Sequence, residues 1–351
     1  MRIEQLTFTR FIAAVAIVIF HYGKGSIIFN NAYIGFLTKQ ANVCVSYFFI
    51  LSGFVMIIAY KNKSHIKIFE YLKNRFARIY PIYLLGLFLV IISLLISPQQ
   101  INLQDFYLNF FMIQAWIPAK ALTLNYPGWS LSVELLFYLI FPFLFNLVYK
   151  KISIKTITVF ILAFWIISQI ILHLMIPVNP IEGFPLSTED LYYFPLMHLN
   201  EFLIGNLAGI YFVKKSTQHR NLDWQIVLTI TVIIGALKLP FGLIYNNGLL
   251  ALLFIPLIVL ISLNNGKLTT IFSSKFFIFL GEISFGIYIL QYPIWVWISD
   301  YRLEKYFQIN KTEDFSLAFF IRLFVLIVIA GISYRFFEIP IRKKIKNFSS
   351  I

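Results

Sequence analysis

Long uninterrupted apolar runs recur along this chain and restrict its fold more than any other feature. Residues 83–96 and 249–263, for example, are apolar on every face. A membrane-spanning strand would alternate polar and apolar residues, so these runs exclude a β-barrel and predict helices. A soluble core is also excluded, because 60% of the 351 residues are hydrophobic and only 13% are charged, which would leave large apolar patches in water. The sequence therefore predicts an all-α protein whose solvent is mostly lipid.

Ten segments are apolar over about the 20 residues that a helix needs to cross a bilayer. They are residues 6–24, 44–60, 79–97, 129–148, 155–176, 192–213, 223–240, 247–263, 276–299 and 316–338. No segment long enough for a soluble domain separates them. We therefore expect residues 1–351 to form a single integral-membrane domain, a polytopic protein with about ten transmembrane helices.

Basic residues indicate the orientation of these spans. If the N-terminus is cytoplasmic, the cytoplasmic segments hold 19 of the 29 lysines and arginines and the outer segments hold seven. Because positive residues concentrate in cytoplasmic loops, both termini are predicted to be cytoplasmic. The formal charge of +14 is thus a topology signal, and nucleic acid is not expected as a partner. The remaining three basic residues, Arg10, Arg322 and Arg335, fall within spans.

Ionisable side chains inside spans usually face a cavity or a partner, which makes them candidates for function. Arg10 and His21 in the first span are eleven residues apart, so they lie within roughly 20° of the same helix face. An interhelical hydrogen bond is the alternative interpretation of His21. Glu134 lies about one turn inside the fourth span, at the depth inferred for His21. A carboxylate and an imidazole at one depth suit an acid–base pair, although neighbouring helices could still keep them apart.

Three further polar groups stand in or beside spans. Small Ser52 and Gly53 near mid-membrane favour close helix packing over chemistry. Arg75 and Arg78 are one turn apart where the third span enters from the cytoplasm; they are either a topology signal or a fork for phosphate groups. Glu201 lies in the middle of the sixth span.

Together these residues resemble the membrane-bound acyltransferase 3 family, bacterial O-acyltransferases that modify cell-surface glycans. The resemblance covers essentially the whole chain. In order, it consists of Arg10 and His21 with ten residues between them, Phe48 to Gly53, Arg75 and Arg78, Trp129 to Glu134, Glu201 with Phe202 and Gly205, and Ser284 to Tyr288. Two positions depart from the family pattern, His198 where an Arg is common and Gln291 where a His is common, and no catalysis is assigned to either.

The resemblance implies an acyl-coenzyme A donor, usually acetyl-CoA, and an acceptor hydroxyl on a surface or lipid-linked glycan. It also implies a multi-pass location in the bacterial inner membrane and a mechanism without a metal. Some relatives carry an added periplasmic hydrolase-like domain, and we expect none here. A transporter or flippase of a lipid-linked glycan is the alternative, because intramembrane ionisable groups also build substrate pathways.

By this resemblance each candidate residue has an expected role. Arg75, Arg78 and Lys73 would hold the phosphates of coenzyme A, and Arg10 would line the inner part of the passage. His21 would act as general base with Glu134 orienting it; an acyl-His21 intermediate is the rival scheme. Four more residues are candidates for oxyanion or substrate contacts, namely Ser52, Ser130, Trp129 and Glu201.

Overall fold

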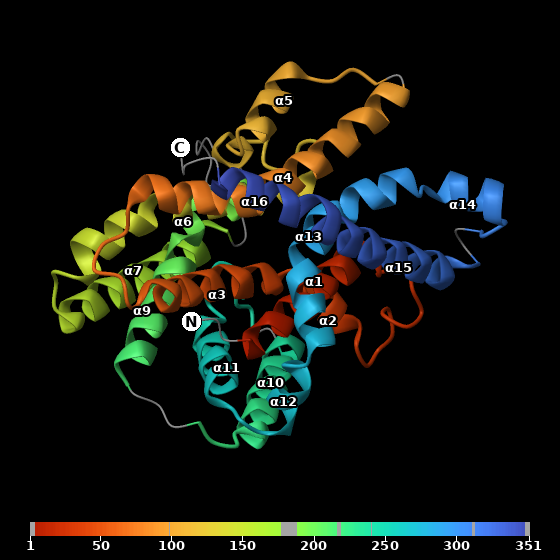
Figure 1. The fold of residues 1–351 in the computed structure, drawn as a ribbon. Helices are drawn as coiled ribbons and strands as arrows, with labels where there is room; N and C mark the ends of the chain where they lie inside the picture. The colour runs from red at the N-terminus through yellow and green to blue at the C-terminus, as the bar shows by residue number, and fades with distance from the viewer. Residues whose placement is uncertain are drawn as a thin grey trace. The chain divides into compact units, whose positions relative to one another are not determined.

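The computed structural model describes residues 4–97, 99–176, 188–215, 219–239, 241–310 and 313–347 (Figure 1). Within these ranges the regular elements are helices, and the one β-bridge joins Arg220 to Asn264. A helix occurs at each of the ten predicted segments. The prediction of an all-α polytopic membrane protein is confirmed.

Among the described residues, eight helical segments are long and apolar enough to cross a membrane. They are α1 (Gln5–Tyr22), α3 (Val43–Tyr60), α4 (Ile68–Ile96), α6 with its flanking turns (Tyr126–Tyr149), α7 (Ile154–Met175), α9 with the preceding turn (Pro195–Lys214), α13 (Lys275–Trp297), and α15 continued through α16 (Phe315–Asn347). The other two predicted spans are helices of 16 and 13 residues, α10 (Asp223–Lys238) and α11 (Ala251–Leu263). The count of ten spans and the side on which the termini lie stay predictions.

Shorter helices connect these segments. They are α2 (Gly35–Gln40), α5 (Leu103–Phe110), α8 (Thr188–Tyr193), α12 (Lys267–Phe272) and α14 (Asp300–Phe307). Turns of 3-10 helix precede α6 at Tyr126–Gly128 and α9 at Pro195–His198, and a π-helix at Tyr334–Glu338 joins α15 to α16 (Ile339–Asn347). The outward apolar side chains of α7, such as Phe160 and Leu174, suit a helix whose neighbour is lipid.

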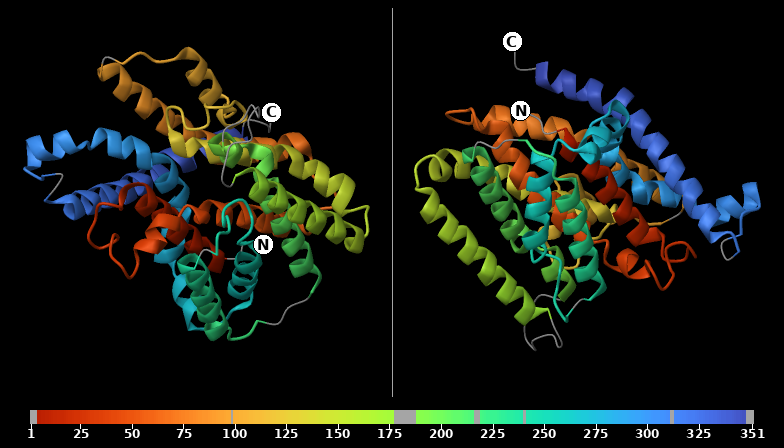
Figure 2. Two further views of the ribbon diagram at one scale, coloured as in Figure 1. Left: turned by 180° about the vertical axis from the view of Figure 1, so that it is seen from behind. Right: turned by 90° about the horizontal axis from the view of Figure 1, so that it is seen from below.

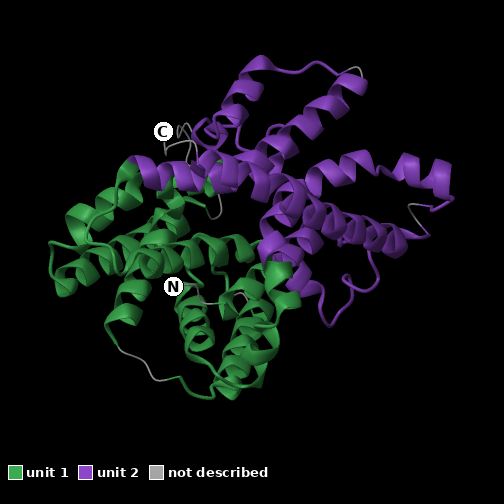
Figure 3. Cartoon of the chain, viewed as in Figure 1, with its two compact units in different colours: residues 1–13, 42–68, 133–281 green, residues 14–41, 69–132, 282–351 purple. Residues whose placement is uncertain are grey.

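The chain divides into two compact units, which Figure 3 colours separately. Unit 1 comprises residues 1–13, 42–68 and 133–281, and unit 2 comprises residues 14–41, 69–132 and 282–351. Each unit is therefore assembled from three separate stretches of chain. Helices α1, α6 and α13 each contribute residues to both units.

In unit 1 the centre is the contact between α3 and α9, where glycines let the two backbones approach. A Cβ atom added at Gly53 would lie 2.2 Å from the Phe202 carbonyl oxygen, and one added at Gly205 would lie 2.2 Å from that of Ile50. The close-packing interpretation of Gly53 thus describes its surroundings well. Helices α10, α11 and α12 of the same unit lie side by side in both views of Figure 2.

In unit 2 side chains of α13 tie together segments that are distant in sequence. The Trp297 indole nitrogen donates to the Leu89 carbonyl of α4 at 2.9 Å. The Trp295 ring packs on Phe319 of α15 with ring centroids 5.9 Å apart. Asn125, just before α6, donates to the Ile289 carbonyl at 3.2 Å. Helix α13 is therefore the element around which this unit is organised.

Candidate active site

His21 lies in the last turn of α1, within unit 2, and its side chain is exposed. Its ring contacts the Tyr126 ring edge-on at 4.8 Å between centroids, and the Phe20 ring at 5.0 Å. Neither imidazole nitrogen forms a hydrogen bond with a residue that the structure describes. The imidazole is thus held by ring contacts, and its nitrogens are available to a reacting group.

Four aromatic residues beside His21 form what we call the aromatic cluster: Tyr22, Tyr126, Tyr292 and Trp295. The Tyr126 hydroxyl donates to that of Tyr22 at 2.6 Å. Tyr22 stacks on Trp295 at 4.1 Å with 16° between the ring planes, and Tyr126 contacts Tyr292 at 5.0 Å. Sequence reasoning missed this cluster, since Tyr22, Tyr126 and the α13 pair are separated from one another by more than 100 positions. The local signals were the adjacency of Tyr22 to His21 and the spacing of three between Tyr292 and Trp295.

Arg322 lies within a predicted span and had no role assigned from the sequence. In the structure it lies beside Trp295 of the aromatic cluster. Its Nε donates to the Ile298 carbonyl at 2.7 Å and its Nη2 to an Asp300 carboxylate oxygen at 2.6 Å. The guanidinium lies 6.0 Å from the centroid of the Trp295 ring. Because Arg322 is only 5% exposed, its charge needs the Asp300 partner, and the pair fixes the position of this guanidinium under Trp295.

The other candidates near the start of α6 have local partners. Glu134 belongs to unit 1, and one of its carboxylate oxygens accepts a hydrogen bond from the Tyr138 hydroxyl at 2.6 Å. The buried Ser130 hydroxyl donates to the Pro127 carbonyl at 3.1 Å, and Trp129 is buried beside it. The pairing of Glu134 with His21 and the oxyanion role of Ser130 stay predictions.

Arg10 and Ser52 both lie in unit 1. Arg10 interacts electrostatically with the Tyr47 side chain of α3, whose hydroxyl donates to Thr9 at 2.6 Å. Ser52 is half-buried and adjoins Gly53 at the α3–α9 contact. The roles predicted for Arg10 and Ser52 stay predictions.

Helix α4 brings the three predicted phosphate-binding residues into one region of unit 2. The Arg75 guanidinium lies 5.4 Å from the Tyr71 ring centroid, and the Lys73 ammonium donates to the Lys346 carbonyl at 2.8 Å. Arg78 interacts electrostatically with the Glu338 carboxylate. All three basic side chains are half-buried.

Helix α16 adds two basic residues that sequence reasoning had counted only as a topology signal. Arg342 interacts with the Glu338 carboxylate together with Arg78, and Lys346 experiences the positive charges of Arg342, Arg75 and Arg78. We call these five residues the basic cluster: Lys73, Arg75, Arg78, Arg342 and Lys346. Two of these cations interact with the Glu338 carboxylate, and three act on the Lys346 ammonium, so basic groups are concentrated in one region, which suits phosphate binding.

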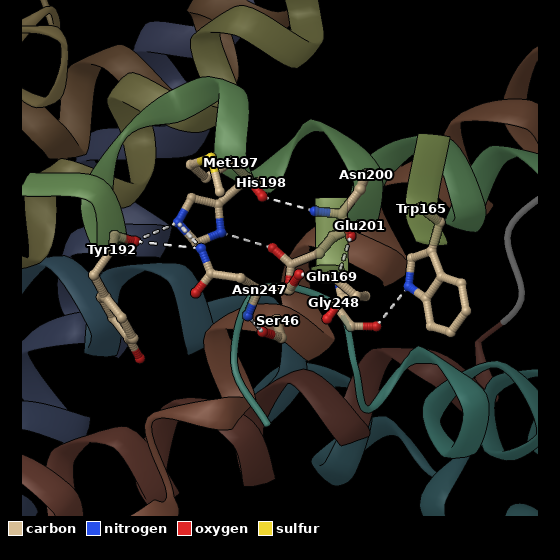
Figure 4. Close-up of polar contacts among 10 residues, drawn as sticks. All are labelled: Ser46, Trp165, Gln169, Tyr192, Met197, His198, Asn200, Glu201, Asn247 and Gly248. Atoms are coloured by element: carbon tan, nitrogen blue, oxygen red, sulfur yellow. Dashed lines mark hydrogen bonds and ion pairs between the residues drawn. The ribbon is translucent and has the colours of Figure 1, made fainter. Parts of the chain in front are cut away.

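Glu201 forms a buried pair with His198, which Figure 4 shows in close-up. A Glu201 carboxylate oxygen is 2.7 Å from His198 Nδ1, and His198 Nε2 donates to the Tyr192 carbonyl at 2.9 Å. Both ring nitrogens of His198 therefore have hydrogen-bond partners within unit 1. Sequence reasoning noted both residues but not their spacing of three, which places them on one helix face.

The turn at Asn247 and Gly248 belongs to the same hydrogen-bond network (Figure 4). The Asn247 N–H donates to Ser46 Oγ at 3.2 Å, and the Gly248 carbonyl accepts from the Trp165 indole at 2.9 Å. Gly248 has φ +106°, and a Cβ atom there would lie 2.1 Å from the Asn200 amide oxygen. Glu201 thus lies in a buried hydrogen-bond network of unit 1, and its role as a substrate contact stays a prediction.

A Gly248→Ala substitution is expected to lower the thermal midpoint of the purified protein. Alanine would combine a left-handed backbone with a clash in the network, each costing about 1–3 kcal/mol. Gly242, also at positive φ (+70°) but with nothing within 4 Å of its added Cβ, is the matched control. Thermal unfolding in detergent measures both; equal shifts for the two variants would show that the clash contributes nothing.

The described residues contain no group of three or more His, Cys, Asp and Glu side chains that could hold a metal ion. The chemistry available at the site described above is that of an exposed imidazole, aromatic rings and a basic cluster.

Comparison with known proteins identifies the family. A family model described as "Acyltransferase domain" (acyltransferase 3) matches residues 3–335. The chain is 25% identical over 372 residues to O-acetyltransferase OatA of Staphylococcus aureus (strain NCTC 8325 / PS 47), with 95% of this chain and 56% of that protein covered. It is 30% identical over 213 residues to acyltransferase MdmB of Streptomyces mycarofaciens, covering 57% of this chain and 51% of that protein.

A putative O-acetyltransferase of S. aureus strain COL is 24% identical over 371 residues, with 95% of this chain and 56% of that protein covered. No solved structure matches the chain. The chain thus spans about half the length of the curated relatives it matches. The family match extends over nearly every residue and includes His21 and the α4 members of the basic cluster, Lys73, Arg75 and Arg78, whereas Arg342 and Lys346 lie beyond it. The chain belongs to the acyltransferase 3 family.

Proposed function

We propose that this chain transfers an acyl group, usually acetyl, from acyl-coenzyme A to a hydroxyl of a cell-surface or lipid-linked glycan. Residues 1–351 would act as one integral-membrane domain in the bacterial inner membrane. Membership of the acyltransferase 3 family supports acyl transfer, and two relatives are named as O-acetyltransferases. The prediction of several membrane-spanning helices suits an enzyme whose donor is made in the cytoplasm and whose acceptor is a surface glycan.

One observation carries the assignment of the reacting residue: the imidazole of His21 is exposed, and neither of its nitrogens bonds a described residue. A general base must reach the proton that it removes within about 3 Å. The buried His198, by contrast, has both ring nitrogens in hydrogen bonds. His21 therefore has the accessibility that a base for the acceptor hydroxyl requires.

In the proposed reaction the acceptor oxygen attacks the thioester carbonyl carbon while His21 takes the hydroxyl proton. The C–S bond then breaks, the acyl group stays on the sugar oxygen as an ester, and the proton passes from His21 to the coenzyme A sulfur. Glu134 would stabilise the imidazolium, and the hydroxyls of Ser52 and Ser130 would assist at the oxyanion. Arg10 would line the inner passage, and Trp129 and Glu201 would contact substrate.

The acyl donor is proposed to bind at the basic cluster, where the diphosphate and 3′-phosphate of coenzyme A would meet guanidinium and ammonium groups. Arginine is suited to such planar, bidentate contacts with phosphate oxygens. The convergence of α4 and α16 on this region supports the assignment, because it adds Arg342 and Lys346 to the residues expected from sequence.

The test of the function is direct. Purified protein is incubated with coenzyme A carrying a radiolabelled acetyl group and with an envelope glycan fraction, and label is followed into the glycan. Incorporation that requires the protein supports the proposal. A protein that is folded and monodisperse but moves no label to any glycan contradicts it.

The donor site gives a prediction with an internal control. Replacing Arg342 and Lys346 together by alanine should raise the KM for acetyl-CoA about tenfold, because a charge-assisted hydrogen bond contributes about 1.5–3 kcal/mol and 1.4 kcal/mol is a factor of ten. Replacing the exposed Lys343 and Lys344 on the same helix removes the same charge outside the cluster and should change KM little. Steady-state rates measured against acetyl-CoA concentration give the KM of both double variants. An equal rise in KM for the two would show that the loss of positive charge, and not the loss of the basic cluster, weakens donor binding.

A further inference from the structure

The four rings of the aromatic cluster lie beside His21 and are linked by ring contacts and one hydrogen bond. Each is half-buried, whereas the neighbouring α13 residues Ile289, Leu290 and Ile294 are buried. Tyr292 and Trp295 are three residues apart and so share one face of α13. Large aromatic surface that stays accessible next to the candidate base is therefore concentrated in one place.

Some polar atoms beside the aromatic cluster bond one another, and others have no partner among the described residues. The hydroxyls of Tyr22 and Tyr126 bond each other. By contrast, the Tyr292 hydroxyl and the two His21 nitrogens form no hydrogen bond with a residue in the described part of the chain. The region thus offers ring faces together with unused hydrogen-bonding atoms.

This combination discriminates between ligands. An acyl chain would cover the rings but leave the Tyr292 hydroxyl and His21 without partners, which is unfavourable for polar groups removed from water. A sugar ring presents a face of C–H groups, which packs on an aromatic ring, and a rim of hydroxyls, which donate and accept hydrogen bonds. Sites of this kind pair aromatic walls with a few orienting polar groups.

The rings are also held in place before any ligand arrives. Trp295 is stacked on Tyr22 on one side and lies over the Arg322 guanidinium, which Asp300 and the Ile298 carbonyl fix in turn. A preset surface loses less conformational freedom when a ligand binds, which favours affinity and a defined orientation.

We propose that the aromatic cluster is the binding site for the sugar ring that carries the accepting hydroxyl. The ring packs against Trp295 and Tyr126, the Tyr292 hydroxyl bonds a hydroxyl of the sugar, and His21 receives the proton of the reacting one. Arg322 and Asp300 are positioning residues that act through Trp295. The inference rests on the proposed function and specifies where its acceptor binds.

The test separates the two substrates kinetically. Rates of label transfer from acetyl-CoA are measured against the concentration of a defined sugar, using chitotetraose and a panel of methyl glycosides as probes. Trp295→Leu is expected to raise the KM for the sugar about tenfold, the effect of losing roughly one ring contact and its buried area. The milder Tyr292→Phe, which removes one hydroxyl, should raise it several-fold, and both should leave the KM for acetyl-CoA unchanged.

Matched controls lie on α13 and on α14, the next helix along the chain. Trp297→Leu removes a tryptophan two residues away whose indole donates to Leu89, and Tyr301→Phe alters an exposed tyrosine outside the cluster. Both should leave the sugar KM unchanged. Should Trp295→Leu fail to fold, Tyr292→Phe and saturation-transfer NMR of chitotetraose with the wild-type protein decide the question.

The outcomes also distinguish this inference from the proposed function. Transfer by the wild type with an unchanged sugar KM in Tyr292→Phe and Trp295→Leu overturns the inference alone. A raised KM for acetyl-CoA in place of the sugar would assign the cluster to the donor arm and likewise overturns it. If the wild type acylates no sugar in the panel or in the envelope fraction, the proposed function fails and the inference fails with it.

Discussion

Replacing His21 by alanine is expected to reduce acyl transfer by about 10²- to 10⁴-fold, the usual contribution of a general base. The loss should appear in kcat and kcat/KM, because the imidazole acts on the proton that moves in the transition state. His21→Gln should be similarly inactive, since an amide keeps hydrogen-bonding capacity but cannot take the proton. Initial rates with radiolabelled acetyl-CoA measure the effect, and size-exclusion chromatography in detergent verifies that the variants fold.

The control for this prediction is His65→Ala, because His65 is an exposed histidine outside the site. It should retain the wild-type rate. A well-folded His21→Ala protein with substantial activity would remove His21 from the mechanism. Label retained on wild-type protein in the absence of acceptor, and absent from His21→Gln, would select the acyl-His21 scheme over the general-base scheme.

The second large effect is expected at the α3–α9 contact. Gly53→Ala and Gly205→Ala should each lower the thermal midpoint, and the valine variants should prevent accumulation of folded protein. The added Cβ atoms would lie 2.2 Å from backbone carbonyl oxygens of the facing helix, so the helices must separate. Overpacking of this kind costs about 1–3 kcal/mol for small additions.

Gly235 in α10 supplies the opposite case, because nothing lies within 4 Å of a Cβ atom added there. Alanine favours a helix over glycine by up to about 1 kcal/mol, so Gly235→Ala should keep or raise the thermal midpoint. The sign of the change in thermal midpoint therefore distinguishes a steric clash with the facing helix from the higher helix propensity of alanine. Thermal unfolding followed by light scattering measures all three alanine variants; a stabilised Gly53→Ala would contradict the close contact.

Several candidate residues could be predicted from the sequence, because the patterns that mark them are local. The spacing of Arg10 and His21, the pair Arg75 and Arg78, and the glycine beside Ser52 each stand out within or directly before one predicted span. The pair of His198 and Glu201 had an equally local signal, its spacing of three, but the two residues were not compared with each other.

The aromatic cluster and the α16 part of the basic cluster had no such signal. Tyr22 contacts Trp295, and Lys73 contacts the Lys346 carbonyl, only because helices distant in sequence pack together. Half-buried tyrosines and tryptophans are numerous in a chain with 19% aromatic residues, so composition could not single out the four beside His21. Their contacts depend on helix rotation and approach, which neighbouring residues in sequence do not specify.

The sequence by itself determined that the chain is helical and where its helices lie, because a backbone in lipid must satisfy its own hydrogen bonds and apolar length sets each span. It also determined which residue types stand inside those spans. Only the tertiary structure decided which distant partners they have, such as Asp300 for Arg322 and the Tyr126 ring for His21. The physical reason is that burial of a span depends on its overall hydropathy, whereas a side-chain contact depends on the mutual position of two helices to within about an ångström.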